Sequence, residues 1–369
     1  MAVEHERRCG EARRALLACG ADFLLAAPSS DLLYLSGFAG EPSERLIALL
    51  LPAVGQPTLI TPQFEAPRVA GAAPFATVLT WVDTDDPVSV VARRVRAAGK
   101  ARPVIAVGEQ TWAGTLLPLQ AELPEASFIT AHPLLTELRQ IKSTGEIELL
   151  RAAAAMTDAA FAHLVEHPLA DKTEAAVAEL LAAEMRRAGL EKVSFLIVAS
   201  GPNAALPHHE PGERRLQPGD LVVLDFGGTY RHYQSDMTRT IAIGRARPEA
   251  QRVHEQVRQA QELAYRAVRP GVAAEDVDSS ARRHLTAAGL GERFTHRTGH
   301  GLGLDVHEEP YIVRGNHLPL REGMVFSVEP GAYLPGQFGA RVKDIVVVTA
   351  EGAERLNHSP RELLAVAAE

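Results

Sequence analysis

The chain has 369 residues, of which 46% are hydrophobic, so it can bury a large core and suits two domains better than one. Its formal net charge of -8 gives no electrostatic reason to expect a nucleic-acid partner. The two cysteines, Cys9 and Cys19, form neither a metal-binding pattern nor a disulfide framework. Residues 1–14 lack the apolar core of a signal peptide, and no stretch is apolar for long enough to span a membrane. We therefore expect a cytoplasmic protein with no membrane partner.

The first part of the chain alternates predicted strands with predicted helices, which indicates an α/β domain over residues 1–135. Expected helices cover residues 5–19, 88–98 and 116–122, and expected strands cover 24–27, 32–35, 45–51, 56–60, 78–81 and 103–107. This region has few clustered polar groups. We expect no catalytic site in it.

A domain boundary is expected between residues 131 and 143, followed by a second domain over residues 143–369. Ser143 and Glu146 have the spacing of a capping box, and a helix is predicted after them. Further helices are expected from Thr173 to Gly189, over 248–268 and over 273–288, with strands over 193–199, 221–226, 232–243, 324–329 and 341–349. Because helices and strands lie in separate runs, we predict an α+β domain.

Residues 220–239 carry two acidic side chains at the ends of strand-like stretches. A valine-rich run ends at Asp225, and a second stretch after the Gly227–Gly228 turn presents Asp236. Burying two like charges together is costly unless a cation lies between them, which points to a divalent metal. Equally, Asp225 can begin a turn and Asp236 can be a solvated strand-end acid. This stretch alone leaves both interpretations open.

Three other clusters in the second domain carry polar side chains. His208 lies in a turn-rich loop, His300 and His307 lie in a glycine-rich loop over residues 298–310, and Glu329 follows an apolar strand. Singly, each is more often structural than functional. Together with the two aspartates they form a set that suits Mn, Co, Fe or Zn and is too poor in sulfur for a structural zinc site. A metal able to activate water would make the chain a hydrolase.

These motifs resemble the metallopeptidase family of the pita-bread fold, which contains methionine aminopeptidases, aminopeptidase P, prolidases and creatinase. Residues 1–135, including the run Leu-Tyr-Leu-Ser-Gly-Phe at 33–38, resemble the creatinase-type N-terminal domain, and residues from 143 onward resemble the catalytic domain. The motifs at 225–240 and 298–310 are the specific ones. The resemblance to both domains implies cleavage of Xaa-Pro bonds in short proline-containing peptides, and it also implies a homodimer.

The resemblance also implies roles for individual residues. Four of the five metal ligands of the family are matched by Asp225, Asp236, His300 and Glu329. His208 and His307 match two histidines that bind substrate and move protons. In the implied mechanism a divalent Mn, Co or Zn ion activates water, Glu329 is both ligand and proton shuttle, and the two histidines stabilise the tetrahedral intermediate or the leaving group.

The sequence departs from the family pattern at the fifth ligand. The family reads Arg-x-Glu-Asp where this chain reads Arg341-Val-Lys-Asp344, so Lys343 replaces a bridging glutamate. A protonated amine cannot bind a metal, and Asp344 should face the other side of the strand. Three carboxylates and one ammonium leave two negative charges. We therefore predict one ion rather than two, Lys343 paired with Asp225 or Asp236, and weakened activity.

Two other functions remain open. The chain can be a metal-free hydrolase of a non-peptide C–N bond, like creatinase, although creatinase-like sites lose several ligands and this chain loses one. It can also be an inactive pseudo-peptidase that serves as a binding module, and Lys343 is the residue that favours this reading.

Overall fold

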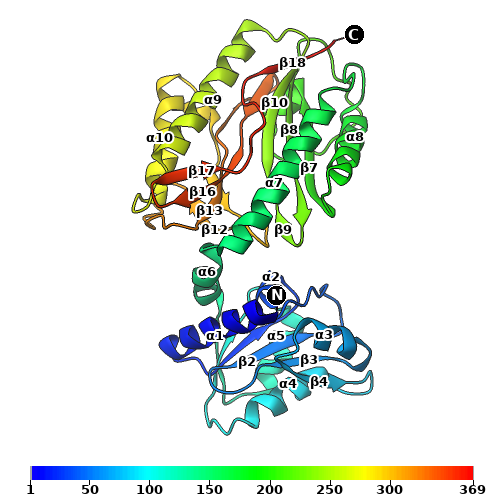
Figure 1. Cartoon of the computed structure of the whole chain (residues 1–369), viewed down its shortest axis with the longest axis vertical. Coiled ribbons are helices and arrows are strands. Elements are labelled where there is room, and N and C mark those ends of the chain that lie inside the picture. Colours follow the sequence, from blue (N-terminus) through cyan, green and yellow to red (C-terminus); the bar gives the residue numbers. More distant parts are fainter. Residues whose placement is uncertain (1, 369) are drawn as a thin grey trace. The chain divides into compact units, whose positions relative to one another are not determined.

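The computed structural model describes residues 2–368, and the chain divides into two compact units (Figure 1). The first unit ends at Arg139 and the second begins at Gln140. The first is an α/β domain and the second has the α+β pita-bread fold. No helix among residues 2–368 is long and apolar enough to cross a membrane.

The first unit is built on a six-stranded mixed sheet with the order β4-β3-β2-β1-β5-β6. Its strands are β1 (Phe23–Ala26), β2 (Ala48–Pro52), β3 (Thr58–Pro62), β4 (Thr77–Trp81), β5 (Val104–Val107) and β6 (Ser127–Thr130). Its helices are α1 (Ala2–Cys19), α2 (Ser30–Ser36), α3 (Ala66–Ala72), α4 (Pro87–Arg96) and α5 (Ala113–Glu122), with the short η1 (Gln63–Glu65). The inner strands β1 and β2 are buried along their whole length.

The strand expected over residues 32–35 is wrong, because these residues lie in α2. The side chain of Ser29 accepts a hydrogen bond from the backbone N–H of Leu32, and Gly37 ends the helix in a left-handed conformation with φ 76°. A short apolar run does not distinguish a buried helical turn from a strand. The capping residues on either side decide for the helix.

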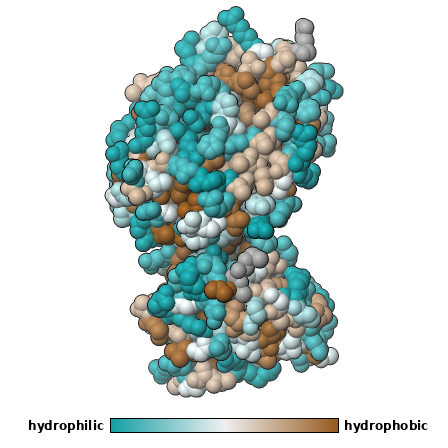
Figure 2. All heavy atoms as spheres, viewed as in Figure 1, coloured by the Kyte–Doolittle hydropathy of each residue, from teal (hydrophilic) through white to brown (hydrophobic). Residues whose placement is uncertain are grey.

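The helices of the second unit begin and end close to the expected residues. They are α7 (Thr144–Leu164), α8 (Glu174–Arg187), α9 (Pro248–Ala267) and α10 (Ala274–Ala287). The short η2 (Gly201–Ala205) lies between α8 and α9, η3 (Gly291–Arg293) follows α10, and α6 (His132–Gln140) ends at the boundary of the two units. The predicted capping box is present at the start of α7, where Ser143 and Glu146 exchange hydrogen bonds. The exposed side of α9 and α10 is mainly hydrophilic, as expected for amphipathic helices (Figure 2).

Two main sheets form the core of the second unit. The first has the order β18-β10-β8-β7 with β9 beside β8, and the second has the order β12-β11-β13-β16-β17. Their strands, with the hairpin β14-β15, are β7 (Lys192–Ser200), β8 (Leu221–Tyr230), β9 (Tyr233–Gln234), β10 (Met237–Ile243), β11 (Gly299–Gly301), β12 (Glu308–Ile312), β13 (Val325–Val328), β14 (Gly331–Leu334), β15 (Phe338–Arg341), β16 (Asp344–Thr349), β17 (Gly352–Arg355) and β18 (Leu364–Val366). Helices α7 and α8 pack on the first sheet, and α9 and α10 pack on the second. A β-bridge between Thr238 and Lys343 joins the two sheets.

Candidate metal centre and active site

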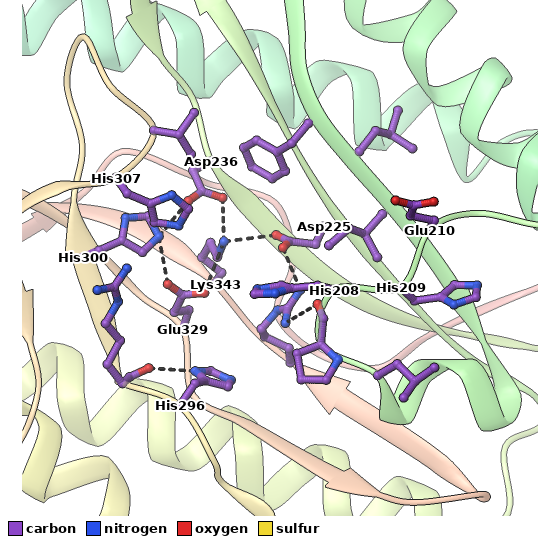
Figure 3. A pocket seen from close by; sticks show the side chains of 18 of the residues that line it. His208, His209, Glu210, Asp225, Asp236, His296, His300, His307, Glu329 and Lys343 are labelled. Carbon is purple, nitrogen blue, oxygen red and sulfur yellow. Dashed lines mark hydrogen bonds and ion pairs between the residues drawn. The ribbon is translucent and has the colours of Figure 1, made fainter. Parts of the chain in front are cut away.

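The two sheets of the second unit bring the predicted metal ligands together. Asp225 lies within β8 opposite Thr238, and Asp236 directly precedes β10. His300 is the middle residue of β11, and Glu329 directly follows β13. The four side chains line one cavity of about 1150 Å³. Asp225 is the fifth of the ten residues of β8, which continues through Gly227 and Gly228, so the turn expected at these glycines is wrong. Neighbouring strands nevertheless place three carboxylates and an imidazole around a common point (Figure 3).

The ammonium of Lys343 lies among the three carboxylates. Its Nζ atom is 2.7 Å from Asp236 Oδ1, 3.2 Å from Asp225 Oδ1 and 3.2 Å from Glu329 Oε2 (Figure 3). The side chain is 5% exposed, so these contacts are shielded from water. Together the carboxylates outweigh burial and raise the pKa of Lys343 far above neutral pH. The amine is therefore protonated and has no lone pair for a metal.

Arg341 adds a second buried cation, which the sequence argument did not count. Its Nη2 atom is 2.6 Å from Asp225 Oδ2, and its Nη1 donates to the hydroxyl of Tyr333 at 2.9 Å. Asp225 Oδ1 also accepts a hydrogen bond from the hydroxyl of Thr238. Two cations thus face three carboxylates, so one negative charge remains rather than the two inferred from the sequence.

The imidazole of His300 directs its Nε2 atom at two carboxylates. Its Nδ1 lies 3.0 Å from the carbonyl oxygen of Gly301, which can only accept, so Nδ1 carries the proton in the neutral ring. Nε2 then faces Glu329 Oε1 at 3.0 Å and Asp236 Oδ2 at 3.4 Å. Both His300 Nε2 and Asp236 Oδ2 are buried without a hydrogen-bond partner among the described residues. A nitrogen lone pair and carboxylate oxygens repel each other unless a cation or a proton lies between them.

The donor set of the cluster suits a divalent ion on the side of Asp236, His300 and Glu329. In residues 2–368, no three His, Cys, Asp or Glu side chains are already arranged as a metal site. Asp236, Glu329 and His300 nevertheless offer two carboxylate oxygens and one imidazole nitrogen, which are the atom types that bind such a metal. On the other side, Lys343 and Arg341 already neutralise Asp225. A second ion there would have to displace both cations.

Burial and the two cations set the ionisation of the carboxylates. Burial alone would raise the pKa of Asp225, but Arg341 and Lys343 outweigh it and hold that pKa below its usual value. Likewise, Lys343 and His300 overcome burial and hold the pKa of Glu329 well below its usual value. The pKa of Asp236 instead rises to about 6, because burial and the other two carboxylates exceed the effect of Lys343.

The two histidines predicted to act on the substrate line the same cavity. The ring of His307 packs on that of His300 with centroids 4.0 Å apart. Burial, with the cations nearby, lowers the pKa of His307 to about 4, so this imidazole is neutral at pH 7. His208 is exposed at the cavity wall, on the Asp225 side of the cluster (Figure 3).

Two further residues complete the description of the site. Asp344 pairs with Arg239 at 2.6 Å and not with the carboxylate cluster, as its place on the strand predicts. Arg297 lines the cavity and stacks over the ring of Tyr311 with 4.1 Å from Cζ to the centroid. Among the described residues, no carboxylate pairs with the Arg297 guanidinium. Sequence reasoning missed Arg297, because one arginine beside a histidine motif gives no separate signal.

Comparison with known families agrees with this geometry. The profile of metallopeptidase family M24 matches residues 148–350, and that of the creatinase/prolidase N-terminal domain matches residues 8–141. The chain belongs to metallopeptidase family M24. It is therefore a peptidase by descent, and its family implies a divalent metal cofactor.

Relatives of this M24 chain cover nearly its whole length. It is 44% identical over 366 residues to the probable dipeptidase PepE of Mycobacterium tuberculosis, covering 98% of this chain and 96% of the relative. It is 36% identical over 334 residues to the Xaa-Pro dipeptidase of Lactobacillus helveticus, covering 89% of this chain and 91% of that protein. The solved structure of recombinant prolidase from Thermococcus sibiricus superimposes with a TM-score of 0.94 at 37% identity, covering 98% of this chain and 99% of the other. Both domains of the M24 chain thus have counterparts in single relatives.

Proposed function

We propose that this M24 peptidase hydrolyses Xaa-Pro dipeptides with one divalent ion, held by Asp236, His300 and Glu329. The observation that carries the proposal is the convergence of three buried donor atoms. His300 Nε2 lies 3.4 Å from Asp236 Oδ2 and 3.0 Å from Glu329 Oε1, in a cavity that also contains His208 and His307. Three protein ligands are a common number for a catalytic metal. Mn, Co or Zn bound there would polarise the scissile carbonyl and activate water.

In this proposal Lys343 acts as a fixed cation in place of a second ion. Its ammonium neutralises Asp225 and Asp236 and holds their carboxylates against each other. It has no lone pair, however, so it cannot share in activating water. We therefore expect lower activity than a two-ion site would have.

Three groups are available to handle protons during hydrolysis. Glu329 Oε1 accepts a hydrogen bond from the hydroxyl of Ser327 at 2.9 Å, which fixes the carboxylate that would take a proton from water. His307 is neutral at pH 7 and would donate one hydrogen bond to the oxygen that becomes negatively charged. His208, on the opposite wall, would assist the leaving group.

The cavity wall supports a short substrate with a free C-terminus. Arg297 has no carboxylate partner among residues 2–368 and lies close enough to lower the pKa of His307, so a substrate carboxylate would complete its pairing. Apolar side chains that line the same cavity would contact a proline ring. These are Phe195, Ile197, Leu206 and Val306. We therefore propose dipeptides, with proline second, rather than long peptides.

One observation supports a second candidate, a metal-free C–N hydrolase. With Lys343 and Arg341 paired, a proton on His300 would balance the last negative charge without any ion. Hydrolysis would then depend on the histidines alone. Removal of metal distinguishes the two candidates, because only the peptidase should lose activity with a chelator and regain it with a divalent ion.

A panel of dipeptides tests the proposal. Protein stripped with chelator is assayed on Xaa-Pro dipeptides, Met-Ala and amidated Xaa-Pro tripeptides, each with added Mn, Co or Zn. We expect metal-dependent cleavage before proline and slower cleavage of the amidated tripeptides. Equal or faster cleavage of Met-Ala would contradict the substrate proposal. Light scattering on the same sample tests the expected homodimer, and cell fractionation tests the expected cytoplasmic location.

A further inference from the structure

Glu174, the first residue of α8, has a fully buried carboxylate outside the metal centre. Its Oε1 accepts hydrogen bonds from the backbone N–H of Ser200 at 2.7 Å and from the Ser200 hydroxyl at 2.6 Å. The amide of Asn203 donates to both carboxylate oxygens at 3.0 and 3.1 Å, and the backbone N–H of Gly212 reaches Oε2 at 3.3 Å. All these donors belong to residues 200–212, the loop that contains His208.

The same carboxylate binds the residue next to His208. His209 Nε2 lies 2.7 Å from Glu174 Oε2. In Figure 3 the imidazole of His208 lies beside Asp225, whereas that of His209 points away from the carboxylate cluster. Neighbouring side chains that point apart are linked through their backbone. The contact of His209 with Glu174 therefore restrains the backbone that carries His208.

The residue before His208 is also held in place. The carbonyl oxygen of Pro207 accepts a hydrogen bond from Arg341 Nη1 at 3.2 Å, and Arg341 pairs with Asp225. His208 thus lies between two fixed points, Pro207 on the metal-centre side and His209 on the Glu174 side. The side chain of His208 itself is exposed, so its direction depends on these two anchors.

We propose that Glu174 is a positioning residue for peptide hydrolysis, holding the 200–212 loop through His209 so that His208 faces the reacting bond. The inference rests on the role proposed above for His208. Hydrogen bonds from Ser200 and His209 outweigh burial and hold the pKa of Glu174 below its usual value, so the anchor is an ionised carboxylate with charge-assisted hydrogen bonds. A displacement of about 1 Å at a reacting group can cost about 10²-fold in rate.

A double-mutant cycle tests the proposal. Glu174→Gln keeps the shape of the side chain but turns one acceptor oxygen into a donor, which cannot accept from His209 and Gly212. We expect it to lower kcat on an Xaa-Pro dipeptide by about 10-fold or more, with a smaller change in KM. In a His208→Ala background the same change should lower kcat by less than about 3-fold, because the imidazole that Glu174 positions is absent. Equal losses in both backgrounds would overturn the proposal.

Helix α8 offers a matched control. Glu184 is also a buried carboxylate of α8, with His167 Nε2 3.4 Å from Oε1 and Arg187 Nε 3.0 Å from Oε2, but neither partner lies in the 200–212 loop. Glu184→Gln should leave kcat nearly unchanged. If Glu174→Gln does not fold, His209→Ala removes the same link from the loop side and enters the same cycle. A loss of kcat in Glu184→Gln as large as in Glu174→Gln would show a general structural effect and overturn the proposal.

Hydrogen exchange separates this inference from the proposed function. Amides of residues 200–212 should exchange faster in Glu174→Gln and His209→Ala than in the wild type and in Glu184→Gln, whatever the substrate. Unchanged exchange would overturn the anchor. If the wild type prefers other dipeptides to Xaa-Pro, the substrate proposal fails, and the cycle is run on the preferred dipeptide.

Discussion

Replacing Lys343 by methionine tests the balance of charge in the metal centre. Methionine has a similar length but no charge, so Lys343→Met leaves the carboxylates of Asp225, Asp236 and Glu329 without the ammonium that lies 2.7 to 3.2 Å from each. Arg341 continues to pair with Asp225 only. The metal-free variant should therefore be less stable than the metal-free wild type.

The size of the effect follows from the burial of the group. Removing one partner of a buried ion pair costs about 3–5 kcal/mol. In a domain of about 150–250 residues, 1 kcal/mol corresponds to roughly 2–4 °C, so the melting temperature of the second unit should fall by about 6–20 °C. A divalent ion at 100 times its Kd returns about 2.7 kcal/mol. Without the competing ammonium the variant should have a lower Kd for the ion, so the same metal concentration should stabilise Lys343→Met more than the wild type.

Calorimetry with and without chelator measures both effects. Lys142→Met is the matched control, because Lys142 is also buried and its Nζ is 2.6 Å from Oε1 of Glu308, which is not one of the three clustered carboxylates. Lys142→Met should be less stable than the wild type, but metal should stabilise it by the same amount as the wild type. An unchanged melting temperature for chelated Lys343→Met, or a metal response equal to that of Lys142→Met, would refute the reasoning.

Four further substitutions give separate readouts. His307→Ala should lower kcat about 10²-fold with metal content unchanged, whereas His300→Ala should lose the metal, as mass spectrometry of the protein will show. Arg297→Gln should raise KM for dipeptides but not for peptides amidated at the C-terminus, as steady-state kinetics will show. Burial lowers the pKa of His254 to about 4, below its usual 6.5, so the folded state resists protonation and the wild type should lose up to about 3 kcal/mol as pH falls from 6.5 to 4. His254→Gln should lose less over that range in urea unfolding, and an equal loss would contradict this assignment. The charged groups that also act on the pKa of His254 are Glu255 and Glu362, which raise it, and Arg258 and Arg239, which lower it.

The sequence could predict the acidic part of the site because its signal is local. An apolar run that leads directly to an acid is unusual, and this pattern indicated Asp225 and Glu329, with Asp236 in the next strand-like stretch. The number of cations could not be predicted in the same way. Arg341 was visible in the motif, but only the structure places its guanidinium 2.6 Å from Asp225. That contact reduces the net negative charge of the cluster from two to one.

The elements and residues that were missed lack a local pattern. Strand β11 has three residues, two of them glycine, and β14 and β18 are four and three residues long, so hydrophobic periodicity has no length over which to act. Glu174 reads in the sequence as an ordinary acid in the first turn of a helix. Its partners are 26 to 38 residues away, and only the fold brings them to it.

Metal content per chain tests the central claim most directly. Wild-type protein and Lys343→Glu are dialysed to equilibrium against the same Mn, Co or Zn buffer, and bound metal is measured by mass spectrometry. The claim that Lys343 replaces the second ion predicts one ion per chain in the wild type, and two ions with higher activity in Lys343→Glu. Two ions at full occupancy in the wild type, about 3.5–4 Å apart in a crystal structure, would contradict it.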